Sequence, residues 1–180
     1  MFFPPSRPAG RFRLLFCGKV FPRKGGMAAL HAWREASLDG AEFWLLGRIA
    51  PDHQHRYREA ATDSVRFLGY DPSPGDAMRQ CHAQILLSSA EGQAKSLIEG
   101  AACGLVTIAT AATGFSFERG DLGFAVDADD IDGIVEILRR LHAEHDFRRR
   151  LSANSANVMR EHYQWASFRQ RLVNAVEAVI

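Results

Sequence analysis

Short runs of apolar residues alternate along this chain with longer stretches in which apolar residues recur every three or four positions. The apolar runs predict six β-strands, at residues 13–17, 42–46, 65–68, 83–87, 106–109 and 123–126. The periodic stretches between them predict helices at about 26–37, 53–62, 74–81, 94–103 and 130–142. Beyond residue 142 the pattern is helical alone, at about 144–161 and 165–180.

The order of these elements predicts an α/β fold. Strands that are apolar throughout and separated by helices are typical of a parallel sheet covered on both faces, so we expect a doubly wound sheet with helices appended at the C-terminal end. Residues 1–11, which contain three prolines in "MFFPPSRPAGR", are interpreted as a linker, 12–162 as the domain and 163–180 as a separate terminal helix. Ligands of such sheets bind beyond the carboxyl ends of the strands.

Composition narrows the classes of partner. A formal charge of +1 over 180 residues provides no general attraction to nucleic acid or to an anionic membrane, so a charged ligand needs a local cluster. The odd number of cysteines, Cys17, Cys81 and Cys103, with no CxxC pair, indicates buried thiols in a reducing compartment. Without a signal peptide or an apolar run of about 18 residues, the chain is expected to be cytoplasmic, with at most peripheral membrane contact.

Three strand ends carry candidate chemistry. The first is "CGKVFPRKGG", residues 17–26, in which Gly18 ends a strand, Lys19 and Lys24 follow, and two glycines lead into a helix. Amides at a helix N-terminus with ammonium groups nearby favour phosphate binding. The stretch is neither a Walker loop nor GxGxxG, and a basic surface loop with glycines for a turn is the simpler alternative.

The second strand end is "FLGYDPSPGD", residues 67–76. Its Gly69, Tyr70 and Asp71 form a stiff loop rich in backbone donors and acceptors, which suits a flat base, although such loops are often only turns.

The third is "EGQAKSLIEG", residues 91–100, where Glu91 and Glu99 flank the start of a helix. An apolar stripe of Ala94, Leu97, Ile98, Ala101 and Ala102 defines the buried face of that helix. The simpler interpretation makes Glu91 a first-turn acid and Lys95 and Glu99 an i,i+4 ion pair. A retaining glycosidase pair is disfavoured, because its carboxyl groups must face each other about 5.5 Å apart.

Taken together, these segments resemble the retaining "group 1" glycosyltransferases of the GT-B fold. The run "EGQAKSLIEGAACGLVTIAT" is similar to their Glu-x7-Glu motif. The runs "RLLFCGKVFPRKGGMAALHAW", "VRFLGYDPSPGDAMRQCHAQILLSS" and "GFAVDADDIDGIVEILRRL" resemble the flanking segments in the same order, over about residues 12–142. The resemblance implies that the sheet is Rossmann-like and forms the donor-binding half of a two-domain enzyme.

The resemblance also implies roles for individual residues. Glu91 would contact the donor sugar or stabilise the charge that develops on it, Lys19 and Lys24 would neutralise the diphosphate, and Glu99 would bind the ribose hydroxyls. The other donor-binding residues would be Gly18, Gly69, Tyr70, Asp71, Gly92, Gln93, Ala94, Lys95, Ser96 and Leu97, with the base at 69–71, the sugar at 92–94 and the pyrophosphate at 95–97. The family often has Arg at the position of Lys19 and an aromatic-glycine pair at Gln93-Ala94.

The implied activity is transfer of a sugar from a nucleoside-diphosphate sugar to a saccharide or lipid acceptor, without a metal cofactor. The acceptor-binding half is missing, so we expect this chain alone to be inactive, with an apolar stripe at Trp165, Phe168, Leu172, Val176 and Val179 free to self-associate. A non-catalytic nucleotide-sugar-binding module and a ligand-free interaction domain are the alternatives. Two further candidates are less favoured: a metal site at His53 and His55, which lacks a third ligand, and lipid docking by Arg139, Arg140 and the "FRRRL" run at 147–151.

Overall fold

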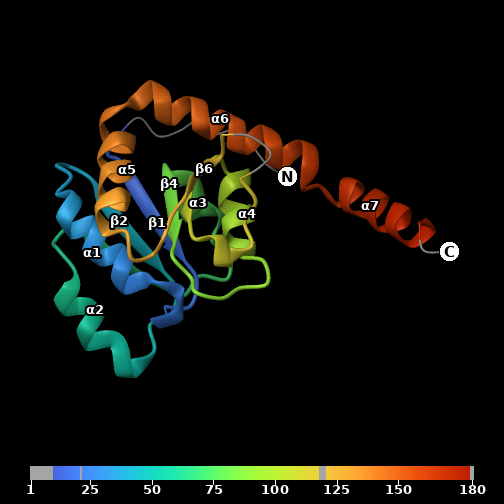
Figure 1. The fold of residues 1–180 in the computed structure, drawn as a ribbon. Coiled ribbons are helices and arrows are strands. Elements are labelled where there is room, and N and C mark those ends of the chain that lie inside the picture. The colour runs from blue at the N-terminus through green and yellow to red at the C-terminus, as the bar shows by residue number, and fades with distance from the viewer. Residues whose placement is uncertain (1–9, 21, 118–120, 179–180) are drawn as a thin grey trace.

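The fold is a six-stranded parallel sheet with helices packed against both faces (Figure 1). The computed structural model describes residues 10–20, 22–117 and 121–178. The strand order is β3-β2-β1-β4-β5-β6, as expected for a doubly wound sheet. The strands are β1 (Arg13–Cys17), β2 (Glu42–Leu46), β3 (Val65–Gly69), β4 (Ala83–Leu86), β5 (Val106–Ala109) and β6 (Gly123–Ala125).

The helices lie within a few residues of their predicted positions. They are α1 (Gly26–Ala36), α2 (Gln54–Ala60), α3 (Gly75–Gln80), α4 (Lys95–Ala102), α5 (Ile131–Ala143), α6 (His145–His162) and α7 (Trp165–Glu177), with short 3-10 turns η1 (Pro22–Lys24), η2 (Pro51–His53) and η3 (Ala111–Thr113). Most of the predicted linker, residues 1–9, lies outside the described residues. Among the described helices, none combines the length and the apolar character that crossing a membrane requires.

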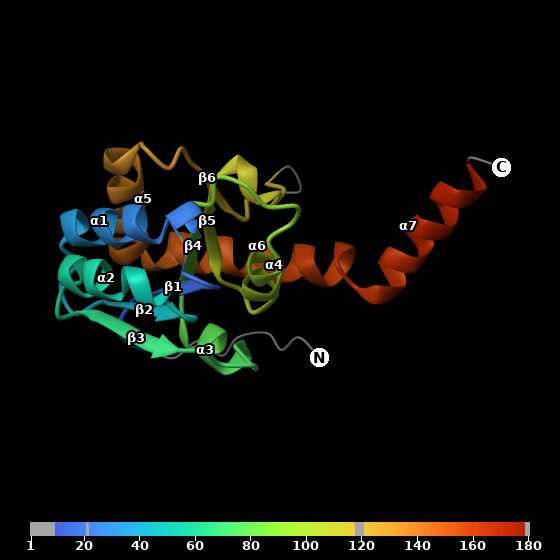
Figure 2. The same cartoon turned by 90° about the horizontal axis from the view of Figure 1, so that it is seen from below.

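Alternating side chains of the strands pack against two layers of helices. Leu14 and Phe16 of β1 join the larger core with α1 and α5, whereas Leu15 between them joins a smaller core with Ala77 and Met78 of α3. Figure 2 shows α1, α2 and α5 on one side of the sheet and α3 on the other. Both views show α7 projecting beyond the end of α6, away from the sheet.

Two arginines from the segments considered for lipid docking, Arg139 and Arg148, join helices together, and Arg139 also remains exposed to solvent. Arg148 is buried, and its guanidinium donates to the carbonyl oxygens of Leu141 and His142 at the end of α5. Arg139 donates to the carbonyls of Glu35 and Ala36 at the end of α1. Both arginines therefore satisfy carbonyls that a helix C-terminus leaves without intrahelical partners.

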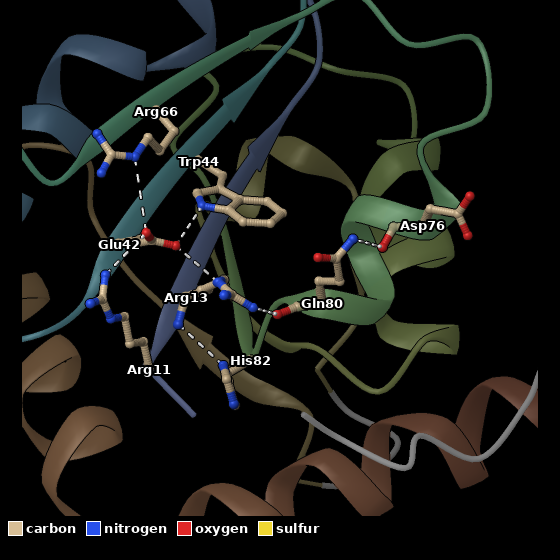
Figure 3. A network of polar contacts seen from close by, with 8 residues as sticks. All are labelled: Arg11, Arg13, Glu42, Trp44, Arg66, Asp76, Gln80 and His82. Atoms are coloured by element: carbon tan, nitrogen blue, oxygen red, sulfur yellow. Dashed lines mark hydrogen bonds and ion pairs between the residues drawn. The ribbon is translucent and has the colours of Figure 1, made fainter. Parts of the chain in front are cut away.

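A polar network stabilises the amino ends of β1 and β2, at the opposite edge from the predicted site (Figure 3). One oxygen of Glu42 accepts hydrogen bonds from Arg13 Nε at 3.0 Å and Trp44 Nε1 at 3.1 Å. Arg11 and Arg66 lie 3.6 and 4.0 Å from the other oxygen. The hydrogen bond from Arg13 lowers the pKa of Glu42 and, with the neighbouring positive charges, outweighs the effect of burial.

The position of α4 depends on a close approach to the sheet. Gln84 of β4 is buried, and its amide nitrogen donates to the carbonyl of Leu97 at 2.8 Å and to Thr107 Oγ1 at 2.9 Å. A Cβ on Gly100 would lie 2.0 Å from the Gln84 side-chain oxygen. Gly100 therefore sits in a helix interior, where glycine is costly, because only glycine leaves room for this contact.

Candidate functional site

The loops that follow β1, β2 and β3 surround a cavity of about 350 Å³ at the carboxyl edge of the sheet. Four of the predicted residues line this cavity: Gly18, Lys19, Tyr70 and Asp71. Predicted Gly69 lines an adjoining cavity of about 640 Å³, which shares Lys19 with the first. The structure thus brings together the first two predicted strand ends, as expected for ligand sites in parallel sheets.

Glycines allow these loops to lie against one another. The amide of Gly18 donates to the carbonyl of Leu46 at 2.9 Å, and that of Gly47 donates to the carbonyl of Gly69 at 2.7 Å. At Gly47, where φ is 150°, a Cβ would lie 1.8 Å from the Gly18 carbonyl oxygen. No side chain fits there, so the backbones of the two loops remain in contact at the floor of the cavity.

Glu91 lies at the third predicted strand end, and its environment differs from the simpler interpretation of a first-turn acid. Helix α4 begins at Lys95, after Ala94 with extended backbone, and its first turn contains no acid. Glu91 instead belongs to the loop between β4 and α4, where its amide donates to the carbonyl of Ala112 at 2.9 Å. The turn at η3 therefore holds the Glu91 backbone ahead of the helix.

The carboxylate of Glu91 makes an ion pair that joins the first and third strand ends. Its Oε1 contacts the ammonium of Lys24, accepts a hydrogen bond from Ser88 Oγ at 2.9 Å, and lies 3.6 Å from the Arg23 guanidinium. The Glu91 and Lys24 side chains are only 13% and 16% exposed. Burial opposes ionisation of Glu91, but Lys24, Ser88 and Arg23 outweigh it, so the pKa of Glu91 is lowered.

The N-terminus of α4 offers backbone donors beside Glu91. Among the described residues, no side chain caps the helix, and the amides of Lys95 and Ser96 belong to the first turn, whose amides have no intrahelical acceptor. The amides of two other predicted residues are occupied, since Ala94 donates to Thr113 and Leu97 donates to Ala94. The helix start can therefore bind an anion through Lys95 and Ser96, a smaller set of amides than the predicted 95–97.

The two remaining loop residues, Gly92 and Gln93, are exposed between Glu91 and the helix. Their backbone conformation is constrained from the opposite side by Gly114, which adopts a left-handed conformation with φ of 66°. A Cβ at Gly114 would lie 2.5 Å from the Gly92 carbonyl oxygen. The exposed loop is thus supported from behind by a contact that requires glycine.

Glu99 lies close enough to Cys17, a residue of the cavity wall, for its charge to act on the thiol. Burial raises the pKa of the Cys17 thiol to about 11, and the charges of Glu99 and Asp71 add to the shift. Cys17 itself lines the 350 Å³ cavity. Glu99 is 40% exposed and pairs with Lys95 at 3.5 Å, so the predicted i,i+4 ion pair is present, and the carboxylate remains accessible from solvent.

Arg48 is a residue of this site that the sequence interpretation missed. It lines both cavities, and its guanidinium lies over the Tyr70 ring, with Cζ 4.7 Å from the ring centroid. A sequence signal was present, because "WLLGR" at the end of β2 repeats the apolar-strand, glycine and cation pattern of "LFCGK" at the end of β1. A cation stacked on an exposed aromatic ring forms a flat wall beside the cavity.

Comparisons with known proteins support this fold. Residues 11–144 match the family described as glycosyl transferases group 1. LpsD of Rhizobium meliloti (strain 1021), a lipopolysaccharide core biosynthesis glycosyltransferase, is 29% identical over 164 residues, which cover 87% of this chain and 46% of LpsD.

Two solved structures have the same fold at low sequence identity. The C-terminal domain of LpcC, a glycosyl transferase group 1 family protein from Francisella tularensis, has a TM-score of 0.79 at 17% identity and matches 91% of this chain and 96% of that domain. Anabaena HepE, solved with UDP and glucose, has a TM-score of 0.80 at 17% identity and matches 94% of this chain and 49% of HepE. The fold is thus a Rossmann-like half of a GT-B protein, and the chain spans about half the length of LpsD and of HepE.

Proposed function

Because this chain belongs to the group 1 glycosyltransferases, we propose that it is the donor-binding half of a retaining enzyme. Such an enzyme moves a sugar from a nucleoside-diphosphate sugar to a saccharide or lipid acceptor. The observation that carries the proposal is the clustering of Glu91, Lys24 and the uncapped start of α4 at the carboxyl edge of the sheet. This arrangement offers a carboxylate for a sugar beside cationic and amide groups for a diphosphate.

The diphosphate binds between the loop after β1 and the start of α4. The ammonium groups of Lys19 and Lys24 and the amides of Lys95 and Ser96 stabilise the negative charge that grows on the leaving group. Fixed cations and oriented amides act most strongly where water is excluded, and they supply the charge for this role without a metal cofactor.

The base binds at the loop Gly69–Asp71, with Arg48 and Tyr70 forming its stacking wall. Cation and aromatic faces both stack on a flat heterocycle. The presence of UDP in the HepE structure supports a nucleoside diphosphate as the ligand of this kind of domain.

The two acids act at opposite ends of the donor. Glu99, near the cavity, accepts hydrogen bonds from the ribose hydroxyls, and Glu91 contacts the transferred sugar. Glu91→Gln should therefore weaken binding of a nucleotide-sugar and spare the free nucleoside diphosphate, whereas Glu99→Gln should weaken both. Isothermal titration measures the four affinities, and equal losses for free diphosphate in the two variants would contradict this division.

The acceptor binds mainly to a second domain that docks against this one, and α7 is part of the docking surface. Leu172, Val173 and Val176 on α7 are 54%, 47% and 51% exposed, an apolar face with no cover among the described residues. The predicted stripe also includes Val179, which lies outside the described residues. The match covers 46% of LpsD, and the role of LpsD in lipopolysaccharide core biosynthesis favours a saccharide or lipid acceptor in polysaccharide biosynthesis.

A thermal-shift panel of UDP, GDP, ADP and their sugar derivatives tests the proposal on this chain. Stabilisation follows mass action, so a ligand at about 100 times its Kd adds roughly 2.7 kcal/mol and gives a clear shift. A shift with one nucleotide series supports donor binding, and no shift with any nucleotide favours the interaction-domain alternative. Sugar transfer after addition of an acceptor-binding half separates the enzyme from the non-catalytic module.

A further inference from the structure

Arg23 connects two of the loops that form the proposed donor site, the loop after β1 and the loop between β4 and α4. It lies in η1, next to Lys24, and its carbonyl oxygen accepts hydrogen bonds from Ser88 Oγ at 3.1 Å and from the Ser89 amide at 2.9 Å. Its guanidinium NH1 donates to the carbonyl of Ala90 and lies 3.6 Å from Glu91. Arg23 thus contacts each of the four residues 88–91 that lead from β4 to the acid.

The contacts at Glu91 are asymmetric. Lys24, Ser88 and Arg23 all contact the same carboxylate oxygen, Oε1. Among the hydrogen bonds of the described residues, none reaches the other oxygen, Oε2. A carboxylate held on one side only has a defined orientation and retains acceptor capacity on the other oxygen.

Lys24 and Ser88 alone do not define that orientation. Lysine is a compact charge on a flexible stem, and a hydroxyl rotates to suit its acceptor. The guanidinium is planar and bonds the backbone of the preceding residue, Ala90, while it approaches Glu91. The Arg23 side chain therefore ties the direction of the Glu91 carboxylate to the backbone that carries it.

We propose that Arg23 is a positioning residue, which holds the loop 88–91 and directs Oε2 of Glu91 to a hydroxyl of the donor sugar. This role rests on the proposed function, because it takes Glu91 to be the sugar-contacting acid. Arg23 itself is assigned no contact with the donor. The carbonyl contacts of residue 23 persist in any substitution, so side-chain variants isolate the contribution of the guanidinium.

The experiment compares Arg23→Ala and Arg23→Lys with the unaltered chain. Arg140→Ala is the matched control, since Arg140 is 51% exposed and pairs with Glu144 at 3.1 Å, against 54% exposure and 3.6 Å for Arg23 with Glu91. The Glu91 carboxyl is titrated by carbon-13 NMR, with Glu91→Gln to assign its signal. Isothermal titration then measures the affinity for UDP-glucose relative to UDP, or for the pair of donor and nucleotide that the thermal-shift panel identifies.

Arg23→Ala should raise the titration midpoint of Glu91 and weaken the nucleotide-sugar about tenfold, while the free nucleotide changes less than about twofold. Arg23→Lys should restore the midpoint, because the charge remains, but only part of the nucleotide-sugar affinity, because a flexible ammonium replaces the guanidinium that bonds the Ala90 carbonyl. Arg140→Ala should change neither quantity.

Two results would overturn the positioning role. One is a folded Arg23→Ala variant with an unchanged Glu91 midpoint and an unchanged affinity ratio. The other is an equal loss of nucleotide and nucleotide-sugar, which would make Arg23 a diphosphate ligand. If the unaltered chain binds no nucleotide-sugar, the proposed function fails, and an unmoved Glu91 midpoint in Arg23→Ala would separately refute the contact with Glu91.

Discussion

Replacing Lys24 by Met removes the main cation from a mostly buried carboxylate and should destabilise the whole domain. Exposed ion pairs contribute about 0–1 kcal/mol, whereas removing one partner of a buried pair costs about 3–5 kcal/mol. The Lys24 and Glu91 side chains are 16% and 13% exposed, which is close to the buried case. Ser88 and Arg23 still stabilise the remaining charge. We therefore expect a loss of about 2 kcal/mol at pH 7, between the two limits.

The loss should depend on pH with a defined sign. The pKa of Glu91 is lowered in the folded state, so its ionised form contributes stability above the unfolded pKa of about 4.3, and the contribution disappears as the pH falls through the folded pKa. Lys24→Met raises the folded pKa of Glu91. The difference between the variant and the unaltered chain should consequently be full at pH 7 and shrink below about pH 4.

Urea unfolding followed by tryptophan fluorescence measures this difference. With a slope of about 2 kcal/mol per molar, the midpoint should fall by about 1 M at pH 7. Lys95→Met is the matched control, because its ion pair with Glu99 is 87% exposed on the lysine side and should contribute less than about 0.5 kcal/mol. The double variant Lys24→Met with Glu91→Gln should recover part of the loss. An unchanged midpoint in Lys24→Met, or a loss that is the same at pH 7 and pH 3.5, would refute the reasoning.

Three further changes test other parts of the structure. Gly100→Ala places a Cβ 2.0 Å from the buried Gln84 oxygen, so the urea midpoint should reveal a loss of about 1–3 kcal/mol, and a neutral result would mean that α4 can shift. Glu42→Gln should destabilise the chain at neutral pH by about 1–2 kcal/mol and less at pH 3. The reason is that the pKa of Glu42 is lowered in the folded state, so its ionised carboxylate stabilises the fold and this contribution is lost as the pH falls through that pKa. We expect the isolated chain to self-associate, as measured by light scattering, and the double variant Leu172→Gln/Val176→Gln to associate less. Equal scattering by the unaltered chain and the double variant would exclude α7 as the surface of self-association.

The fold could be predicted from sequence because its signals are local. Buried parallel strands are apolar on both faces, and the helices between them carry apolar residues at helical spacing, so short windows define each element. The α4 stripe of Ala94, Leu97, Ala101 and Ala102 is buried as predicted, with Ile98 partly buried. The glycines and cations at strand ends marked the edge at which the candidate site forms, because all carboxyl ends of a parallel sheet meet there.

Contacts between distant segments could not be predicted in this way. Nothing near Glu91 in the sequence indicates that Lys24 and Arg23 are its partners, or that the η3 turn holds it outside the helix. Arg48 acquires its place only when β2 and β3 bring it over Tyr70.

Arg148 illustrates the same limit within a charged helix. An arginine is expected to be exposed to solvent, yet the packing of α6 against α5 buries the Arg148 side chain, which donates hydrogen bonds to two carbonyls at the end of α5. Periodicity reports which face of an element is apolar, and it contains no information on which charged groups the folded chain brings together. The sequence therefore determined the elements and the edge of the site, whereas the tertiary structure decided the partners of each charge.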